Sequence, residues 1–333
     1  MHNSNPQSVT VVVPTFSRGE PLRTTLNALL ASTSDGLEFV EILVVDDGSP
    51  LPAAPLVNSL PAAAPFSLRC IRQPNSGPGA ARNAGFRQAR GRIVIFVDDD
   101  IIVPPSLIQQ HLRAHARLPQ SVICGLSTLI RPRLVTPLYH FISSLSGDQP
   151  HSVSEPEFWE TDIPNSQHIS VERGMFDVAG AIYHDDLFTP AAEEFGLAFR
   201  LRQAGIRLVF ALRITALHDQ PLDLGGVCRQ QYKHALGTAE VIQKYPSARS
   251  LPALERMIQA NLEKTRGLSL QALKRRVLRC LASDPLRKGG LRAIETLQNM
   301  IPLPSVVLPP LYRAIVSAHY HAGLRDGSRR EWS

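Results

Sequence analysis

The stretch RIVIFVDDDIIVP, residues 92–104, joins the pattern of a buried strand to three adjacent acidic residues. The apolar run Ile93 to Val97 indicates a strand covered on both faces, as in a parallel sheet. Asp98, Asp99 and Asp100 follow without a break. Adjacent carboxylates repel one another, and a buried charge without a partner is costly. This strand end therefore predicts either a solvated edge, where aspartate is common, or a bound cation.

The composition is that of a globular protein. With 333 residues, 44% of them hydrophobic, the chain is long enough for one large or two medium domains. No apolar run approaches the roughly 18 residues of a membrane span, and the polar start MHNSNPQSVT does not resemble a signal peptide, so we expect a cytoplasmic protein. Four widely spaced cysteines without a CxxC pair favour buried thiols; they are Cys70, Cys124, Cys228 and Cys280.

Charge changes sign along the chain. Residues 1–224 contain 17 arginines, no lysine and 22 acidic residues, whereas residues 225–333 contain 18 basic and 7 acidic residues. So sharp a change indicates two regions with different roles. We expect a domain over 1–224 that carries the chemistry and a basic helical region over 225–333.

Strands and helices alternate in the first region. The helix after the first strand should carry Leu22, Leu26, Leu29 and Leu30 on its apolar face. This rhythm predicts βαβ units and an α/β fold with a mostly parallel sheet. A short helix is expected over 193–205. Strands are expected over residues 8–14, 39–47, 67–73, 92–98, 121–125, 175–184 and 206–219.

Three of these strands end in polar residues. Pro14 and Thr15 end the first, Asp46 and Asp47 end the second, and the aspartate triplet follows the fourth. Ligands of such sheets sit beyond the carboxyl ends of the strands. Carboxylates that gather there favour a hard divalent cation, Mg²⁺ or Mn²⁺, shared with a substrate pyrophosphate.

The glycine-rich stretch NSGPGAARNAG, residues 75–85, follows the third strand and opens a helix, so its backbone N–H groups can face an anion. It departs from a dinucleotide-binding fingerprint in two ways. Arg82 stands where the third glycine is needed, and the stretch follows the third predicted strand instead of the first. An arginine at this place suits a phosphate or a nucleobase edge. A hydride-transfer enzyme is therefore the weaker interpretation.

Four stretches, taken in order, resemble the family 2 glycosyltransferases over about residues 8–220. They are residues 9–32, 41–50, 75–107 and 193–219. The resemblance implies a GT-A fold, which is an α/β fold with a Rossmann-like mixed sheet, here followed by a C-terminal helical region. It also implies a nucleotide-diphosphate sugar donor, with a UDP-sugar favoured, a divalent metal, and transfer with inversion at the anomeric carbon.

The resemblance implies roles for individual residues, motif by motif. The entry motif after the first strand lines the nucleoside, the VDDGS turn binds the uracil edge or ribose, and the arginine of the glycine-rich stretch lies beside base and phosphate. The outer positions of the DxD motif lie nearest the ribose and the metal, and in some members a histidine completes the metal shell. The nucleotide-binding residues so implied are Pro14, Thr15, Arg18, Asp46, Asp47, Arg82, Asp98 and Asp99, and the metal ligands are Asp98, Asp100 and His218.

Glu193 and Glu194 match the ED motif of the family. An acceptor hydroxyl must lose its proton as it attacks, and a carboxylate within hydrogen-bond reach can accept that proton. We expect Glu194 to be this base and Glu193 to orient it or to hold an acceptor hydroxyl. Because the second residue of the family motif is usually aspartate, the opposite assignment within the pair stays open. Acidic residues also favour a helix N-terminus for dipole reasons alone.

The region 225–333 predicts helices without chemistry of their own. The segment 269–283, SLQALKRRVLRCLAS, has one apolar side and one basic side. A solvated charged face is one interpretation; the other is docking on an anionic membrane surface, at the inner face of the cell membrane where lipid-linked acceptors reside. With 6% aromatic residues and no recognisable binding module, nucleic-acid binding is disfavoured. Residues 230–234, QQYKH, lack the Arg and Trp of the QxxRW motif of processive members, so a single-sugar transfer is implied.

Three classes of function remain open. The favoured class is a metal-dependent inverting glycosyltransferase of cell-envelope polysaccharide biosynthesis, acting on a lipid-linked or saccharide acceptor. A nucleotidyltransferase shares the sheet and the metal, but PTFSRGE, residues 14–20, replaces the GxGxR-type signature expected after its first strand. An inactive nucleotide-sugar binding protein is the third class, and it has no need of both the DxD motif and the acidic pair.

Overall fold

The computed structural model describes residues 8–145, 156–162, 164–176, 182–184, 186–187, 189, 192–221, 223–252, 254–255, 282–300 and 307–332. The chain divides into two compact units. The first contains Met1–Ile130, Pro150–Phe188 and Gly196–Gln220. The second contains Arg131–Gln149, Thr189–Phe195 and Pro221–Ser333, so it also takes two segments from within residues 1–224.

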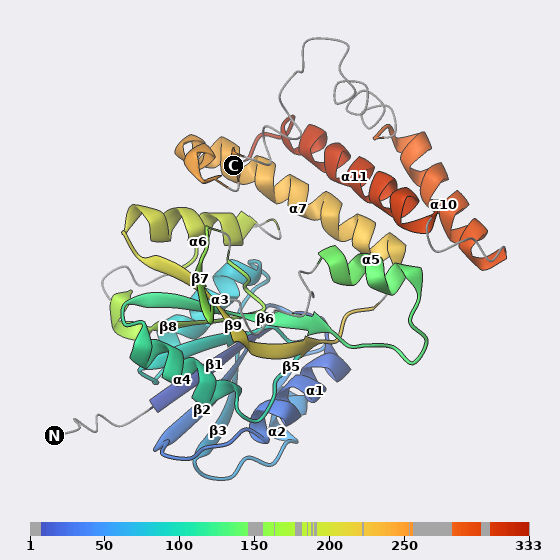
Figure 1. The fold of residues 1–333 in the computed structure, drawn as a ribbon. Helices are drawn as coiled ribbons and strands as arrows, with labels where there is room; N and C mark the ends of the chain where they lie inside the picture. The colour runs from blue at the N-terminus through green and yellow to red at the C-terminus, as the bar shows by residue number, and fades with distance from the viewer. Residues whose placement is uncertain are drawn as a thin grey trace. The chain divides into compact units, whose positions relative to one another are not determined.

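A mixed sheet forms the centre of the first unit (Figure 1). Over the described residues the strand order is β3-β2-β1-β4-β8-β6-β9-β5, and β7 pairs with β9. Strands β1 to β4 run parallel, whereas β8 is antiparallel to both β4 and β6. The strands are β1 Ser8–Thr15, β2 Phe39–Asp46, β3 Phe66–Arg72, β4 Ile93–Val97, β5 Ile101–Ile102, β6 Ser121–Leu129, β7 Phe158–Glu160, β8 His168–Glu172 and β9 Arg207–His218.

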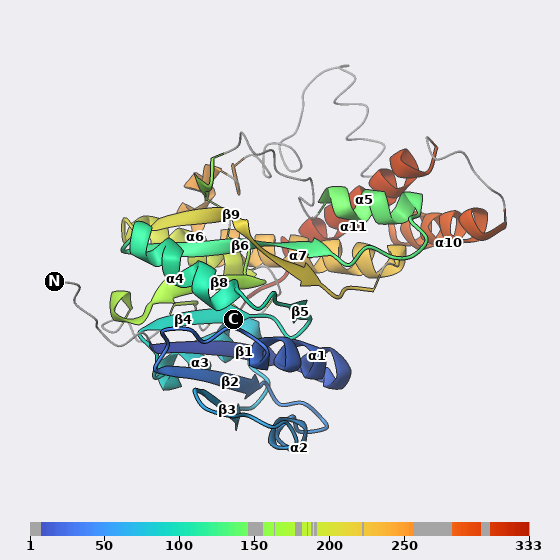
Figure 2. The ribbon, with the colours of Figure 1, turned by 60° about the horizontal axis from the view of Figure 1, so that its bottom comes forward.

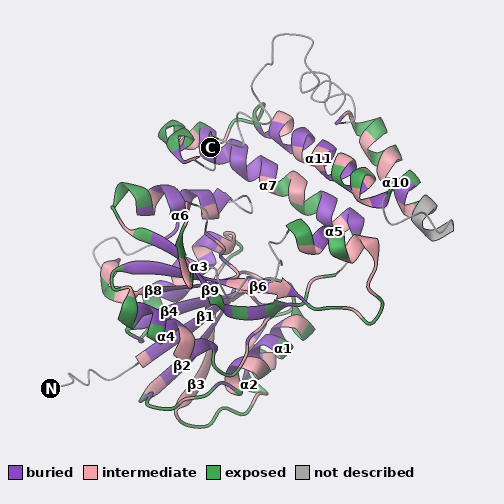
Figure 3. Ribbon diagram, in the orientation of Figure 1, coloured by how far each residue is buried: buried purple, intermediate pink, exposed green. Residues whose placement is uncertain are grey.

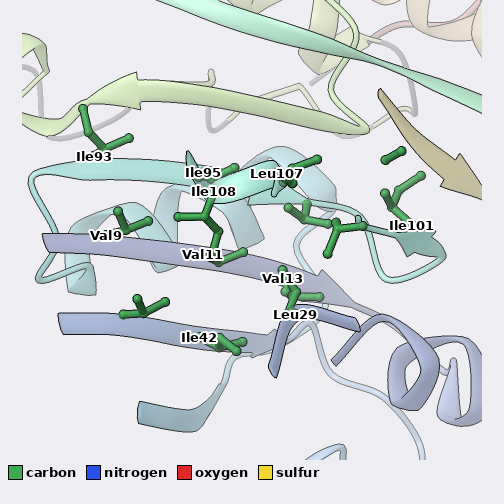
Figure 4. Close-up of a cluster of buried hydrophobic side chains, with 14 of the residues drawn as sticks. Val9, Val11, Val13, Leu29, Ile42, Ile93, Ile95, Ile101, Leu107 and Ile108 are labelled. Atoms are coloured by element: carbon green, nitrogen blue, oxygen red, sulfur yellow. The ribbon is translucent and has the colours of Figure 1, made fainter. Parts of the chain in front are cut away.

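Helices bury both faces of this sheet (Figure 2). Alternate residues of β1 point to opposite faces, because side chains alternate along a strand. Val9, Val11 and Val13 pack with Leu29 of α1 and Ile108 of α4 on one face (Figure 4). The other face packs against α3 and the later turns of α6. The helices of this unit are α1 Gly19–Leu30, α2 Ala54–Asn58, α3 Pro78–Gln88, α4 Leu107–Arg117 and, shared with the second unit, α6 Ala192–Gln203.

Most of the predicted elements are confirmed. The strands expected over 8–14, 39–47, 67–73, 92–98 and 206–219 form β1 to β4 and β9, and the helix expected over 193–205 forms α6. The strand expected over 121–125 continues as β6 to Leu129. Cys124 and Cys228 are buried free thiols and Cys70 is partly buried, while Cys280 lies outside the described residues.

The strand predicted over 175–184 is wrong where the structure describes it. Met175 closes a 3₁₀-helix, Arg173–Met175, instead of opening a strand. The backbone N–H groups of Ile182 and Tyr183 both donate to the side-chain Oδ1 of Asn83, at 3.0 Å each. The Asn83 side chain thus accepts hydrogen bonds from the backbone N–H groups that, in a strand, would donate to a neighbouring strand. Residues 177–181 lie outside the described part.

A polar network lies inside the first unit between α4 and β8. His111 Nδ1 and His115 Nε2 each lie 2.8 Å from the Ser170 hydroxyl, and His111 Nε2 lies 3.2 Å from His168 Nδ1. All four residues are buried. Gly125 faces the His168 ring so closely that a Cβ there would overlap it. Burial lowers the pKa of His115 and of His168 to about 4, and it lowers the pKa of His111 well below its ordinary value.

These histidines predict a loss of stability in acid. In the unfolded chain these histidines become protonated near pH 6.5, the ordinary pKa of histidine. In the folded core His115 and His168 become protonated only near pH 4. The free energy of unfolding should therefore be highest above pH 6.5 and should fall toward pH 4, by up to about 1.4 kcal/mol per pH unit for each histidine. In urea unfolding at constant ionic strength, His115→Gln should make that slope shallower. If the free energy of unfolding fell equally steeply with pH in the variant and in the unaltered protein, His115 would not be a source of the acid sensitivity.

Helices make up the described part of the second unit, without a strand (Figure 3). They are α5 Pro137–Leu145, α7 Leu224–Lys244, α10 Asp284–Met300 and α11 Leu308–Gly327, with a 3₁₀ turn at Pro246–Ser250. Gly323 and Gly327 of α11 lie against Ala235 and Ala239 of α7, where an added Cβ would overlap the partner helix. In the described ranges no helix is both long and apolar enough to cross a membrane. Most of the amphipathic segment expected over 269–283 lies outside the described residues.

Candidate active site at the carboxyl edge of the sheet

The sequence-predicted acids gather where the strand order reverses. Chain connections run from β1 to β3 on one side, and β4 then returns to the other side of β1. Because β1, β2 and β4 are parallel, Thr15, Asp46 and the start of the aspartate triplet lie at the same edge of the sheet. Such a switch point is where open α/β sheets bind their ligands.

Each aspartate of the triplet has its own partner in the protein. Asp98 accepts a 2.7 Å hydrogen bond from the buried guanidinium of Arg82. Asp99 accepts one of 2.7 Å from the Thr15 hydroxyl. Asp100 is paired with Arg18, whose guanidinium also lies 3.8 Å from Asp99. Two arginines and a hydroxyl therefore hold apart three carboxylates that would otherwise repel one another.

Asp100 also faces His218, the residue predicted to complete a metal shell. His218 Nε2 lies 3.5 Å from Asp100 Oδ2. Two strand ends fix this approach, because Ile101 pairs with His218 and the Asp219 N–H donates to the Asp100 carbonyl at 2.9 Å. The side-chain amide of Gln167 lies 3.0 Å from His218 Nδ1, which orients the ring with Nε2 toward the aspartate.

Two of the three carboxyl groups, those of Asp99 and Asp100, differ in protonation. Burial raises the pKa of Asp99 to about 7, although Thr15 and Arg18 act in the opposite direction. Burial also acts to raise the pKa of Asp100, but His218 and Arg18 outweigh it, and the pKa of Asp100 is lowered. Near neutral pH, Asp100 is therefore an anion available to a cation, whereas Asp99 is close to half protonated.

The residues at the site fit a divalent ion that is coordinated partly by the protein and partly by the substrate. Asp100 Oδ2 supplies an oxygen ligand of the type that Mn²⁺ and Mg²⁺ prefer, and His218 Nε2 supplies an adjacent nitrogen, which suits Mn²⁺ better than Mg²⁺. In the described part of the chain, no group of three or more His, Cys, Asp or Glu side chains is arranged to hold a metal. The remaining ligands would then be phosphate oxygens and water, which is the usual situation of magnesium at nucleotide sites.

Asp46 and Asp47, predicted to touch base or ribose, hold the loops around the site. Asp46 accepts from the N–H groups of Ser49 and Ala53, at 2.8 and 3.0 Å, which shapes the turn after β2. Asp47 accepts from Gln73 Nε2 and from two N–H groups of the glycine-rich stretch, Ser76 and Gly77, at 2.7 to 2.9 Å. Those two N–H groups thus bind a carboxylate of the protein itself, and a role of either aspartate toward substrate stays a prediction.

The entry motif turns sharply between β1 and α1. Pro14 is half-buried in β1, and Ser17 has a positive φ of 58°, the conformation in which asparagine is more usual than serine. The Ser17 N–H donates to the Ser49 hydroxyl at 2.9 Å, which ties this turn to the one after β2. The turn brings the half-exposed Arg18 side chain back over the aspartate triplet.

Two functional candidates, Asn83 and Tyr183, escaped the sequence analysis. Asn83 of α3 is buried and bonds the Tyr183 backbone twice, through Oδ1 and through Nδ2 at 2.9 Å. The neighbouring Arg82 lies with its guanidinium carbon 5.4 Å from the centre of the Tyr183 ring. The segment at 182–183 thereby supports the arginine that binds Asp98. The only hint in the sequence was that Asn83 directly follows Arg82 in ARNAG. The partner of Asn83, Tyr183, lies 100 residues away and could not be predicted from that hint.

The proposed acidic pair lies in the first turn of α6. Glu193 is buried, and Glu194 is half-buried. Residues up to Phe195 belong to the second unit, whereas Leu197 and Leu201, further along the same helix, pack in the core of the first. The aspartate triplet and the acidic pair thus belong to different units, and the catalytic role of the pair rests on the motif.

The fold is that of the GT-A glycosyltransferases. The mannosyltransferase PcManGT from Pyrobaculum calidifontis, solved in complex with GDP-Man and Mn²⁺, has a TM-score of 0.58. The two chains are 17% identical, and the match covers 95% of this chain and 86% of that one.

A family model matches part of the chain. The model described as Glycosyl transferase family 2 matches residues 10–139, and this match confirms the resemblance over that part of the chain. The uncharacterized glycosyltransferase YfnE of Bacillus subtilis is 28% identical over 189 residues, 53% of this chain and 47% of its own length. The succinoglycan biosynthesis protein ExoW of Rhizobium meliloti is 39% identical over 108 residues, 31% of this chain and 33% of its own. The chain thus spans about half or less of these curated relatives.

Proposed function

We propose that the protein is an inverting glycosyltransferase that moves one sugar from a nucleotide-diphosphate sugar to an acceptor hydroxyl. The observation that carries this proposal is the triplet Asp98–Asp100, set at the switch point of a GT-A sheet with Arg18 and Arg82 against it. Carboxylates and guanidinium groups together suit a donor with hydroxyls on its ribose and negative charge on its diphosphate.

The residues at the triplet bind and orient the donor. Asp98, held by Arg82, would accept from the ribose hydroxyls, and Arg18 can turn from Asp100 to the phosphates when they arrive. Asp100 and His218 would hold Mg²⁺ or Mn²⁺, which would neutralise the charge that accumulates on the departing diphosphate. Asp99, between Asp98 and Asp100 in the sequence, is hydrogen-bonded to Thr15.

Glu194 is the proposed base. The acceptor oxygen attacks the anomeric carbon as the bond to the diphosphate breaks, and the acceptor proton passes to a carboxylate oxygen of Glu194. Attack opposite the leaving group inverts the configuration of that carbon. Glu193, buried beside it, would orient Glu194 or hold a second acceptor hydroxyl.

The acceptor is proposed to be a saccharide or a lipid-linked saccharide. ExoW, one of the relatives, is described as a succinoglycan biosynthesis protein, and a role of this chain in cell-envelope polysaccharide synthesis would agree with that description.

A panel of substrates separates this function from the alternatives. A glycosyltransferase should release a nucleoside diphosphate from one or more nucleotide sugars in the presence of Mn²⁺. A nucleotidyltransferase should instead release pyrophosphate from a nucleoside triphosphate and a sugar phosphate. A binding protein should retain a nucleotide sugar and release neither. Identifying the nucleotide that copurifies with the full chain would narrow the panel first.

We also propose that the second unit docks reversibly on an anionic membrane. Its exposed basic residues outnumber its exposed acids, and on α10 the exposed Lys288 and Arg292 accompany Leu286, which is 52% exposed. Basic residues near an anionic leaflet contribute about 1 kcal/mol each, an attraction that salt screens. The exposed basic residues in the described part of the second unit are Arg131, Arg133, Arg229, Lys233, Arg249, Lys288, Arg292, Arg313, Arg329 and Arg330.

The membrane proposal predicts salt-sensitive sedimentation of the full chain with vesicles that contain phosphatidylserine. The protein should pellet at low salt, release at high salt, and ignore vesicles of phosphatidylcholine alone. Replacing both Lys288 and Arg292 by glutamate should weaken binding, since both side chains are exposed on one helix. Equal behaviour on the two kinds of vesicle would leave the basic residues as ordinary solvated surface.

A further inference from the structure

A buried carboxylate in α7 bonds the segment that leads into the acidic pair. Glu240 is fully buried, and its Oε2 accepts a 3.1 Å hydrogen bond from the backbone N–H of Thr189. Its Oε1 lies 3.8 Å from Lys244 Nζ, one turn further along the same helix. Glu240, Lys244 and Thr189 all belong to the second unit.

The same segment starts α6. The carbonyl of Thr189, on the residue that Glu240 holds, accepts a 3.0 Å hydrogen bond from the Ala192 N–H, the first residue of the helix. Glu193 and Glu194 follow at once, in the same unit. A displacement of Thr189 would therefore change where the helix begins and how its first turn presents these two side chains.

The stability of α7 alone does not account for the buried carboxylate of Glu240. Taking a carboxylate out of water costs several kcal/mol, and a lysine partner at 3.8 Å returns only part of that cost. An apolar residue would fill the same volume in α7 without the penalty. A carboxylate, however, can bind a loop N–H more strongly than a neutral acceptor can, because charge adds to the strength of the hydrogen bond.

We propose that Glu240 is a positioning residue for the catalytic acids: it fixes the segment at Thr189 so that Glu193 and Glu194 are presented in one geometry. This role rests on the proposed function, in which Glu194 is the base. It gives the helical region, expected from its sequence to have no chemistry of its own, an indirect part in the reaction, through the two acids. Displacing a reacting group by about 1 Å can lower a rate on the order of 100-fold.

A double-mutant cycle on the full chain tests this role. Glu240→Ala should lower kcat on the order of 100-fold and leave KM for the nucleotide sugar unchanged. In a Glu194→Gln background, Glu240→Ala should have little further effect on kcat, because the group that it positions is already disabled. Glu240→Gln should restore most of the activity, since its amide oxygen can still accept from the Thr189 N–H.

The control variant is Gln243→Ala, on the same helix. Gln243 donates to the Gly327 carbonyl of α11 at 3.2 Å, so its loss loosens helix packing in the second unit without touching Thr189. It should leave kcat unchanged. Equal losses of kcat from Glu240→Ala in the two backgrounds would overturn the proposal, as would a comparable loss from Gln243→Ala. Full turnover by Glu194→Gln would instead contradict the part of the proposed function that makes Glu194 the base, so the two failures are distinguishable.

Discussion

Glu194→Gln is expected to lower turnover by about two to four decades, the range typical of a lost general base, while donor binding is retained. Glutamine keeps the size of the side chain and its place in the first turn of α6, but it cannot accept the acceptor proton at neutral pH. Steady-state transfer rates and calorimetric titration with the nucleotide sugar measure the two quantities separately. A fall in donor affinity that matches the fall in turnover would contradict the assignment.

Glu193→Gln is the matched control, because the two glutamates are adjacent and differ in burial. It should reduce turnover less than Glu194→Gln does. If Glu193→Gln removes turnover and Glu194→Gln does not, the base is Glu193, and the opposite assignment within the pair is the correct one.

Asp100→Ala is expected to remove the dependence of nucleotide binding on Mn²⁺. Asp100 is the anionic member of the triplet that faces His218, so its loss leaves the imidazole as the only donor of that pair. Side chains that merely support a metal ligand are worth 10- to 100-fold in metal affinity, and loss of a ligand itself should cost at least about that much. Calorimetric titration of the nucleoside diphosphate, with Mn²⁺ or with excess EDTA, measures the difference.

Asp219→Ala is the control for charge at this edge of the sheet. Asp219 is an exposed acid next to His218, and its backbone N–H, which bonds the Asp100 carbonyl, is retained in the variant. The metal dependence should be unchanged. Undiminished turnover of the unaltered protein in excess EDTA would contradict the metal proposal as a whole.

The parallel half of the sheet could be predicted from the sequence because it obeys a simple pattern. Apolar runs such as Ile93 to Val97 are buried on both faces, and each ends in the polar residues that a carboxyl edge requires. The hydrogen-bond partners of the aspartate triplet could not be predicted from the sequence. Thr15 and Asp99 are 84 residues apart, and only the pairing of β1 with β4 brings them together.

Other features escaped prediction because polar residues replace the expected apolar pattern. β8 begins with His168 and contains Ser170, both buried, and their side chains form hydrogen bonds with His111 and His115 of α4. An apolar run at 175–184 predicted a strand, yet at its described end the Asn83 side chain takes the backbone N–H groups. Side-chain hydrogen bonds over long sequence distances leave no periodic signal.

Transfer of a sugar with inversion is tested most directly by following a nucleotide sugar and its product together by NMR. With Mn²⁺ and an acceptor saccharide, we expect the full chain to release a nucleoside diphosphate and to form a glycoside whose anomeric configuration is opposite to that of the donor. The same mixture with Glu194→Gln should remain almost unchanged over the same time. A product with the donor's own configuration, or nucleotide sugars that stay intact across the whole panel, would contradict an inverting glycosyltransferase.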